Sequence, residues 1–262
     1  MMALDFVSPL FVPADRPERF EKAAASGADA IILDLEDAVA PQRKDAARVA
    51  LRADFTSLPV FVRVNGICTP WHKADVAAAA RLSVDGIVLP KAEAGDRLDL
   101  LLKESAVPVL ALIETVRGLA EARRIACLDG VARLVFGSID FCADLGAAHT
   151  REALLAARSE LVLASRLAGL PAPIDGVTTA IDDAALATAD ARHALDLGFG
   201  GKLAIHPKQV EPILTGFRPE ATEIEWACKV LSSGDGAAAV DGAMVDEPVR
   251  IRARGILKRA DQ

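Results

Sequence analysis

Residues 107–115 read VPVLALIET, an apolar run of strand length that ends in an acid. Short runs of the same kind recur along the chain and alternate with longer amphipathic stretches, a pattern typical of alternating strands and helices. Together with residues 107–113, the strongest strand candidates are residues 8–12, 30–35, 60–64, 86–89 and 132–136. Weaker runs at residues 173–177 and 202–205 bring the number of predicted strands to eight.

Helical periodicity fills most of the intervals between these strands. Leu98, Leu101 and Leu102, for example, show the i, i+3, i+4 spacing of a buried helical stripe. The predicted helices cover residues 16–26, 44–52, 96–104, 119–128, 151–168 and 184–197. Strand-helix units at intervals of roughly 25 to 30 residues, with no linkers between them, favour a closed (β/α)8 TIM barrel over an open doubly wound sheet.

The alternation stops after Phe217. A helical stretch at residues 221–231, a run of small residues at 232–239 and a basic helix at about residues 249–259 follow. We therefore predict a TIM-barrel domain at residues 1–218 that carries the chemistry, and a C-terminal helical extension at residues 219–262 that can contact a neighbouring subunit.

Composition excludes several kinds of partner. The chain has 262 residues, 52% of them hydrophobic, and its 30 basic residues are scattered among 37 acidic ones, so nucleic acid is not expected as a partner. No apolar run approaches the roughly 18 residues that span a bilayer, and no secretion signal is evident, so we expect no membrane contact and a cytoplasmic location. The four cysteines are widely spaced, without metal-ligand spacing.

Functional groups follow almost every predicted strand. In a TIM barrel the carboxyl ends of the strands meet at one mouth, where the chemistry takes place. Helix caps also place polar residues there, so any one of them is weak evidence alone. The candidates, in chain order, are Asp15, Arg16, Asp34, Glu36, Asp37, Arg63, Asn65, Lys91, Glu114, Asp140, Asp175 and His206.

Glu114 is difficult to explain as a cap, because it directly follows the buried run that ends at Ile113. An unpaired carboxylate at the rim of a low-dielectric core is unfavourable, and a bound cation would relieve this. Asp140 ends the next unit, so both carboxylates should reach the same mouth. Two carboxylates with open positions for water and substrate suit Mg²⁺, whereas softer metals prefer imidazole or thiolate.

Strand alternation places Asp34 and Glu36 on one face, and Arg63 and Asn65 on one face. Glu36 and Arg63 could form a buried ion pair that only ties neighbouring strands together. Alternatively, Glu36 holds the guanidinium so that Arg63 meets a substrate carboxylate or thioester oxygen with its fork of donors. The two interpretations are compatible.

Lys91 and His206 also leave alternatives open. A desolvated Lys91 could form a Schiff base, but a metal-dependent route needs no imine. His206 is either a rim residue near the substrate or a structural hydrogen-bonding histidine.

Seven ordered motifs make the sequence resemble the HpcH/HpaI aldolase and citrate lyase beta-subunit superfamily, nearest to its citrate lyase beta-like branch. The resemblance runs nearly end to end. The motifs are LFVP at residues 10–13, LDLEDAV at 33–39, VRVN at 62–65, LPK at 89–91, IET at 113–115, FGSID at 136–140 and GGKLAIHP at 200–207.

The resemblance implies a TIM barrel that assembles as a homotrimer or a multiple of it, with Mg²⁺ on Glu114 and Asp140 and with Arg63 on the substrate. Members that act on free 2-keto acids have a catalytic histidine where this chain has Asp37, so the departure favours the thioester branch. In malyl-CoA-type members an aspartate of a Met-(Ile/Val)-Asp segment reaches a neighbouring subunit's site. Met244-Val245-Asp246 looks like that segment, although Asp246 could equally be a helix N-cap.

The predicted function is that of a Mg²⁺-dependent carbon-carbon lyase acting on a 3-hydroxyacyl thioester of CoA or of a carrier protein, of the malyl, citramalyl or citryl type. Three alternatives stay open: malyl-CoA hydrolysis or synthesis on the same site, a free 2-keto acid aldolase, and a non-catalytic subunit of a citrate lyase complex. The predicted catalytic residues are Arg63, Glu36, Asp37 and Asp246, with Asp246 ahead of Asp37 as proton acceptor, and the predicted substrate contacts are Arg63, Asn65, Lys91 and His206.

Overall fold

The computed structural model of the chain describes residues 4–234, 238–240 and 242–260. The chain divides into two compact units, Met1–Gly216 and Phe217–Gln262. An eight-stranded parallel sheet belongs to the first unit, and a pair of helices with a two-stranded hairpin belongs to the second.

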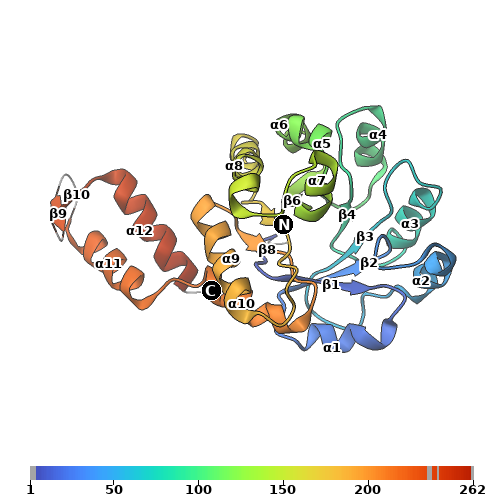
Figure 1. Cartoon of the computed structure of the whole chain (residues 1–262), viewed down its shortest axis with the longest axis horizontal. Coiled ribbons are helices and arrows are strands. Elements are labelled where there is room, and N and C mark those ends of the chain that lie inside the picture. The colour runs from blue at the N-terminus through green and yellow to red at the C-terminus, as the bar shows by residue number, and fades with distance from the viewer. Residues whose placement is uncertain (1–3, 235–237, 241, 261–262) are drawn as a thin grey trace. The chain divides into compact units, whose positions relative to one another are not determined.

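The eight strands of the first unit follow one another around the sheet in chain order (Figure 1). The two ends of the sheet meet, because the Phe11 N–H donates to Ala204 O and the Ala204 N–H donates to Pro9 O, each at 2.9 Å. The predicted (β/α)8 TIM barrel is therefore confirmed. Its strands are β1 (Pro9–Pro13), β2 (Ala30–Asp34), β3 (Val60–Arg63), β4 (Gly86–Leu89), β5 (Val109–Ile113), β6 (Val131–Phe136), β7 (Ile174–Asp175) and β8 (Gly201–Lys202).

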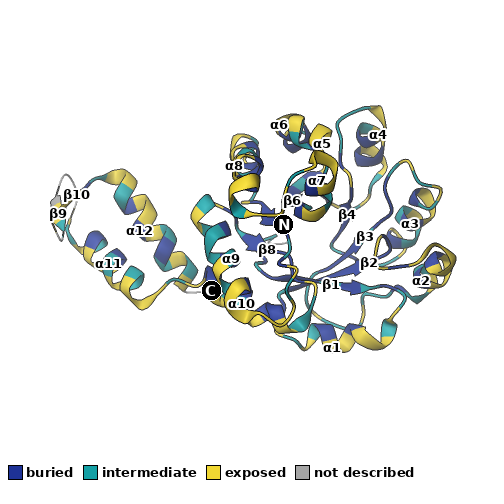
Figure 2. Ribbon diagram, viewed as in Figure 1, coloured by how far each residue is buried: buried dark blue, intermediate teal, exposed yellow. Residues whose placement is uncertain are grey.

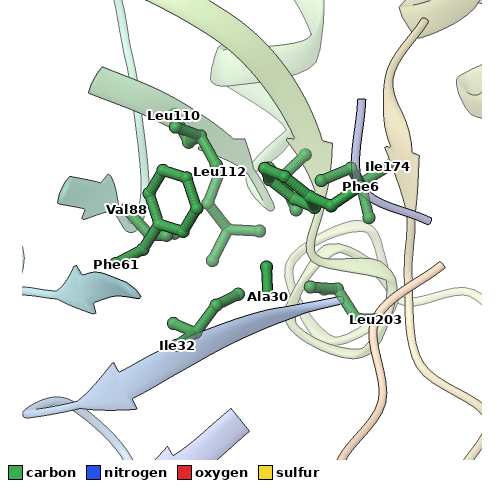
Figure 3. Packing of buried hydrophobic residues seen from close by; sticks show 10 residues of the cluster. Phe6, Ala30, Ile32, Phe61, Val88, Leu110, Leu112, Ile174 and Leu203 are labelled. Atoms are coloured by element: carbon green, nitrogen blue, oxygen red, sulfur yellow. The ribbon is translucent and has the colours of Figure 1, made fainter. Parts of the chain in front are cut away.

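Alternate residues of the strands fill the interior of the barrel. Successive side chains of a strand point to opposite faces, so every second one faces the axis. Ile32, Phe61 and Leu112 meet there from three different strands, as Figure 3 shows. The same buried cluster contains Phe6, Ala30, Val88, Leu110, Val135, Ile174 and Leu203.

Arg133 closes the amino end of the barrel. It lies two residues before Val135 on the same face of β6 and is 2% exposed. Its guanidinium donates to Leu4 O at 2.6 Å, to Phe6 O at 2.9 Å and to Ala172 O at 2.7 Å. The segment before β1 is thereby tied across the floor of the barrel, opposite the end where the strands reach their carboxyl termini.

Helices surround the strands and keep one side in solvent, whereas the strands are buried (Figure 2). Thr150 and Asp183 cap two of them by accepting a backbone N–H with the side chain, and Gly146 and Gly198 end two in the left-handed conformation. The helices are η1 (Pro17–Arg19), α1 (Phe20–Ala24), η2 (Pro41–Arg43), α2 (Lys44–Ala50), α3 (His72–Ala79), α4 (Asp96–Glu104), α5 (Val116–Ala120), α6 (Ala122–Ala126), α7 (Ser138–Leu145), α8 (Arg151–Leu167), α9 (Ala184–Leu197), η3 (Pro207–Gln209) and α10 (Val210–Phe217).

The second unit consists of α11 (Ala221–Ser232), β9 (Ala238–Val240), β10 (Ala243–Val245) and α12 (Glu247–Ala260). The two helices pack through Ala227 and Val230 against Ala253 and Ile256, and Val245 of the hairpin joins this small core. Within the described part of the chain, no helix combines the length and the apolar character that crossing a membrane requires.

The structure departs from the prediction where periodicity is weak. The alanine-rich sequence of α3 has no leucine stripe, so its apolar residues do not show the helical period. We expected Asp140 at the end of a strand, but β6 ends at Phe136 and Asp140 lies in the first turn of α7. The polar residues after β6 therefore begin a helix, and the ladders of β7 and β8 are only two residues long.

Replacing Leu112 by alanine should lower the free energy of unfolding by about 2 to 5 kcal/mol, because it opens a cavity in the barrel interior that the surrounding strands cannot refill. Leu100→Ala is the matched control, since Leu100 is 55% exposed and should change the value by less than about 0.5 kcal/mol. Denaturant unfolding of both variants measures this, and equal effects would contradict the interior position of Leu112.

Candidate functional site

A pocket of about 400 Å³ lies at the carboxyl ends of the strands. Leu112, Phe136 and Leu203 give it apolar lining, while Asp34, Arg63, Glu114 and Asp140 line it with charge. Its remaining lining residues are Phe11, Pro13, Asp37, Ala38, Gly137, Ser138, Ile139, Val177 and Ile205.

The strand period explains which charged residues reach this pocket. Asp34 stands two residues beyond Ile32 in β2, and Glu114 stands two residues beyond Leu112 at the end of β5. Each is the next inward position above the apolar core. Arg63 is the neighbour of Asp34 in the register of β2 and β3. The site is therefore the layer of the barrel interior above the hydrophobic cluster.

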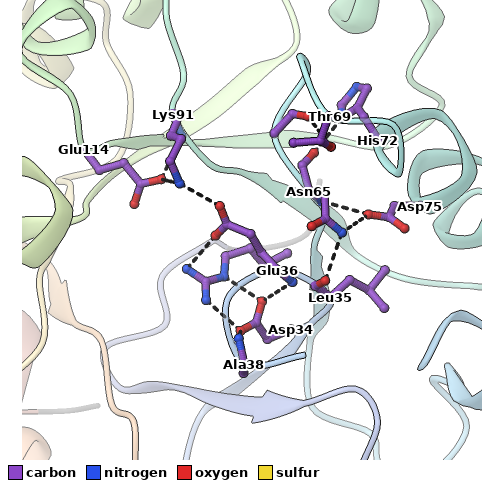
Figure 4. Close-up of polar contacts among 12 residues, drawn as sticks. Asp34, Leu35, Glu36, Ala38, Asn65, Thr69, His72, Asp75, Lys91 and Glu114 are labelled. Carbon is purple, nitrogen blue, oxygen red and sulfur yellow. Dashed lines mark hydrogen bonds and ion pairs between the residues drawn. The ribbon is translucent and has the colours of Figure 1, made fainter. Parts of the chain in front are cut away.

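Asp34 and Arg63 form a two-pronged ion pair at the centre of this layer. Arg63 Nε donates to Asp34 Oδ1 at 2.7 Å, and Nη2 donates to Oδ2 at 2.6 Å. The same carboxylate accepts the N–H groups of Glu36 at 2.8 Å and of Ala38 at 3.1 Å (Figure 4). The guanidinium also lies 4.7 Å above the Phe11 ring. Asp34 thus fixes both Arg63 and the loop after β2.

The protonation of Arg63 is secured by its neighbours. Burial lowers the pKa of Arg63, but the charge and hydrogen bonds of Asp34, together with the charge of Glu36, outweigh it and hold the pKa above its usual value. Nη1 lies 3.1 Å from Glu36 Oε2. Since a guanidinium has five N–H groups, Nη1 and Nη2 keep donors for a substrate oxygen.

Glu36 and Lys91 connect this pair to Glu114. Lys91 Nζ donates to Glu36 Oε1 at 2.8 Å and lies 3.6 Å from Glu114 Oε1 (Figure 4). The Lys91 backbone N–H donates to the same Glu114 oxygen at 2.9 Å. Burial raises the pKa of Glu36, and Arg63 and Lys91 counter part of this effect.

Glu114 is 2% exposed, and its two oxygens have different surroundings. Oε1 faces Lys91, whereas Oε2 lies beside Gly137 at the start of α7, the helix that carries Asp140. Burial raises the pKa of Glu114 to about 8, with further contributions from the charges of Glu36 and Asp140, while Lys91 opposes the rise. Glu114 is therefore a carboxylate whose ionised form would gain from a cation near Oε2.

The residues present suit Mg²⁺. Glu114 and Asp140 offer hard carboxylate oxygens at an open pocket, which leaves positions for water and substrate. Among residues 4–234, 238–240 and 242–260, no group of three or more His, Cys, Asp or Glu side chains is placed to bind a metal. A site for zinc or another soft metal, which needs three or four such protein ligands, is thus not formed by the described residues.

Gly137 makes room for the Glu114 side chain. A Cβ atom at this position would collide with the Cβ and Oε2 atoms of Glu114, although the Gly137 backbone itself is not in the left-handed region. The Gly137 N–H also donates to Ile113 O at 2.9 Å. The absent side chain lets β6 and α7 approach the Glu114 carboxylate closely.

A second ion cluster supports the pocket from outside the barrel. Asp175 accepts from Arg158 Nε at 2.9 Å and from Lys202 Nζ at 3.3 Å, and all three side chains are buried. Lys202 Nζ also donates to Gly176 O at 2.6 Å. Gly176 precedes Val177 of the pocket lining, so this cluster holds the short strands β7 and β8 in place. The buried ion pairs of Asp175 therefore indicate a structural role for this side chain.

The structure brings several predicted site residues together. Arg63, Asp37, Glu114 and Asp140 line the pocket, and Glu36 contacts Arg63 directly behind it. Asp37 is exposed at the rim. Lys91 stands next to this group through its contacts with Glu36 and Glu114, with a half-exposed side chain.

Like Glu36 and Lys91, three other predicted residues are absent from the pocket lining. Asn65 is buried and donates to Leu35 O at 2.9 Å and to Asp75. His206 accepts the Lys208 N–H at 3.2 Å through Nδ1, as the N-cap of η3. Asp246 belongs to the second unit, where Oδ1 accepts the Val249 N–H at 3.3 Å at the start of α12. Their predicted roles in binding or catalysis stay predictions.

Two contributors to the site could not be found from the sequence. The sequence predicts Glu36 as the partner that orients Arg63, but the fork of the guanidinium is held by Asp34, and Glu36 contacts Nη1. Nothing in the sequence signals this pairing, because it depends on the register of β2 and β3. The second contributor is Phe11 beneath the guanidinium, whose aromatic ring within an apolar strand gives no specific signal.

Comparison with known proteins agrees with this architecture. The family model described as HpcH/HpaI aldolase/citrate lyase matches residues 8–207. A citrate lyase subunit beta-like protein of Mycobacterium tuberculosis is 39% identical over 97% of this chain and 95% of its own length. A (3S)-malyl-CoA thioesterase of Cereibacter sphaeroides is 35% identical over 98% of this chain and 95% of its own.

A solved structure is similar over the whole chain. It is the CitE protein of Mycobacterium tuberculosis in complex with magnesium, acetoacetate and coenzyme A, which is 37% identical, covers 100% of both chains and has a TM-score of 0.89. The barrel, with acids and an arginine at its mouth, and the match to this family model define an enzyme of a lyase family. The chain belongs to the HpcH/HpaI aldolase/citrate lyase family, as the sequence motifs indicated.

Gly137→Ala should weaken Mg²⁺ binding by about ten-fold or more, because the added methyl group displaces the Glu114 carboxylate. Gly255→Ala in α12 is the control, since a Cβ there has only Arg259 Nη1 within 4 Å, at 3.9 Å. Isothermal titration with Mg²⁺ measures both variants. An unchanged affinity in a folded Gly137→Ala protein would contradict the assignment of Glu114 as a ligand.

Mg²⁺ binding should release protons in a pH-dependent way. Below the Glu114 pKa of about 8 the metal-free carboxyl is largely protonated, so the ion must displace a proton. We expect affinity to rise about ten-fold per pH unit up to that pKa and then to level off. Titration at pH 7 and pH 9.5 in buffers of different ionisation enthalpy measures this. Equal proton release at pH 7 and pH 9.5, or an unchanged pH dependence of Mg²⁺ affinity in Glu114→Gln, would refute this role of Glu114.

Proposed function

We propose that this chain is a Mg²⁺-dependent carbon-carbon lyase that cleaves or forms a 3-hydroxyacyl-CoA thioester of the malyl, citramalyl or citryl type, with a 2-keto acid and an acyl-CoA as the other partners. The observation that carries the proposal is one pocket that contains both a carboxylate pair, Glu114 and Asp140, and an arginine with free N–H groups, Arg63. Magnesium and coenzyme A are named in the complex of the similar CitE protein.

Glu114 and Asp140 would hold the metal. Both residues line the pocket, Glu114 from the end of β5 and Asp140 from the first turn of α7, and, besides burial, the charge of Asp140 raises the pKa of Glu114, which supports a shared metal position. Bound there, Mg²⁺ supplies Lewis acidity and a template for the oxygens of the 2-keto acid fragment.

Arg63 would stabilise the charge that develops in the reaction. In the cleavage direction a base takes the proton of the 3-hydroxyl group, the carbon-carbon bond breaks, and its electron pair moves onto the thioester oxygen as an enolate. Protonation of the enolate carbon then yields the acyl-CoA. Asp34 holds the Arg63 guanidinium through Nε and Nη2, and Arg63 lines the pocket, so its remaining N–H groups would need little reorganisation to meet that oxygen.

The proton acceptor is assigned to Asp246 of a neighbouring subunit ahead of Asp37. Asp37 is exposed at the pocket rim, where it can reach a bound substrate directly. Asp246 requires the assembly of chains into a homotrimer or a multiple of it. We further propose that Asn65, Lys91 and His206 contact the substrate together with Arg63. The proposed location of the protein is the cytoplasm.

Thioester hydrolysis is the second candidate, and a specific comparison favours it: the relative from Cereibacter sphaeroides is named a (3S)-malyl-CoA thioesterase. In that reaction water attacks the thioester carbonyl and the thiol leaves. The same Arg63 donors would face the oxyanion. Free thiol as a product therefore separates the two activities.

Glu114→Gln and Asp140→Asn should each lower the turnover number for 2-keto acid release by about 10³-fold, because the Lewis acid is lost. Asp129→Asn, on an exposed residue, should leave turnover unchanged. Malyl-, citramalyl- and citryl-CoA, each with and without Mg²⁺, are assayed for keto acid and free thiol separately. Keto acid without thiol supports the lyase, thiol supports the thioesterase, and no product from any substrate contradicts both.

A further inference from the structure

Lys91 has an unusual backbone conformation for a residue with a side chain. Its φ of +51° makes it the one residue other than glycine with positive φ in the described part of the chain. The left-handed region is unfavourable for a residue with a Cβ atom, so such a residue persists only where its surroundings require it. Pro90, directly before it, has no N–H, and Lys91 therefore supplies the first backbone donor after β4.

The conformation brings a hydrogen-bond donor and a positive charge of Lys91 to one oxygen atom. The Lys91 N–H donates to Glu114 Oε1 at 2.9 Å, and the Lys91 ammonium lies 3.6 Å from the same oxygen. The next N–H, of Ala92, donates to Leu112 O at 3.1 Å, which anchors the turn to β5. Oε1 is thus occupied by Lys91, and Oε2 is left beside Gly137, at the start of the helix that carries Asp140.

The ammonium also has a second anionic neighbour. Glu36 Oε1 accepts from Lys91 Nζ at 2.8 Å, and the other Glu36 oxygen lies 3.1 Å from Arg63 Nη1. Glu36 therefore holds the ammonium 3.6 Å from an oxygen of Glu114, a proposed metal ligand. A fixed positive charge at this distance repels a divalent ion on Glu114, even where solvent screens part of the effect.

We propose that Lys91 is a positioning residue for Glu114 that also sets the affinity of the metal site: its backbone N–H holds Oε1 and leaves Oε2 beside Gly137, while the charge of its ammonium weakens the binding of a divalent cation. The inference rests on the metal site of the proposed function. It gives Lys91 a role that needs no contact with the substrate.

The test is calorimetric titration of the full chain with MgCl₂ at several pH values up to 9.5. The affinities are compared where they no longer rise with pH, because removal of Lys91 also removes a charge that lowers the Glu114 pKa. Lys91→Met keeps the backbone N–H and removes the charge, so it should bind Mg²⁺ about ten-fold more tightly than the parent protein. Lys91→Arg keeps the charge and should bind like the parent, and so should Lys103→Met on the exposed end of α4. Lys91→Gln repeats the neutral substitution if Lys91→Met is unstable.

The backbone part of the inference has its own readout in the metal-free protein. Lys91→Gly and Lys91→Ala both remove the ammonium, but glycine adopts positive φ without strain. The Gly variant should therefore melt about 2 to 4 °C above the Ala variant. Equal melting temperatures would contradict a strained turn at this residue.

Two outcomes separate the failure of this inference from that of the proposed function. If Glu114→Gln abolishes Mg²⁺ binding while Lys91→Met binds no more tightly than the parent, the role of Lys91 is wrong and the metal site stands. If Glu114→Gln binds Mg²⁺ like the parent, the metal site itself is wrong, and the inference fails with it.

Discussion

Side chains of a closed barrel have two directions available, into the barrel or out toward the helices, and each strand alternates between them. In β2 and β5 the inward positions hold Ile32 and Leu112 and then, one step further, Asp34 and Glu114. These acids are nearly as buried as the apolar residues beneath them. Charges at such a depth persist only with partners, so the candidate site is the layer in which ion pairs replace apolar packing.

As a consequence, the interactions that stabilise the fold at this layer also orient the side chains that are proposed to carry the chemistry. Asp34 accepts two donors from Arg63 and two from the loop after β2. Glu36 then connects Arg63 to Lys91, and Lys91 connects to Glu114. Removal of one member leaves its neighbour buried without compensation, which typically costs about 3 to 5 kcal/mol. Interactions that hold the loops in place are therefore the same ones that orient the donors facing the pocket.

This layering also explains what could be predicted from the sequence. The barrel and the acid Glu114 followed from short-range patterns, an apolar run and the polar residue that ends it. The choice of Asp34 over Glu36 as the partner of Arg63 depends on the register between β2 and β3, which a single sequence does not display. The left-handed turn at Lys91 lacks the usual signal, because glycine is the residue that normally marks it. Asp246 belongs to the second unit, which has its own core. An aspartate that caps α12 and an aspartate that acts at another subunit's site would have the same local sequence, so the sequence does not separate the two roles.

The hydrogen bonds that Arg133 makes across the amino end of the barrel limit where a ligand can enter and leave. With its floor sealed by the chain itself, the barrel offers a ligand a route that begins and ends at the same mouth. Whatever is bound against Leu112 and Glu114 then lies beneath whatever occupies the rim. For a reaction that splits one molecule into two at this depth, the outer fragment has to depart before the inner one, and in the joining direction the inner one has to arrive first. The order of events would be set by the blocked end of the barrel, far from any reacting atom.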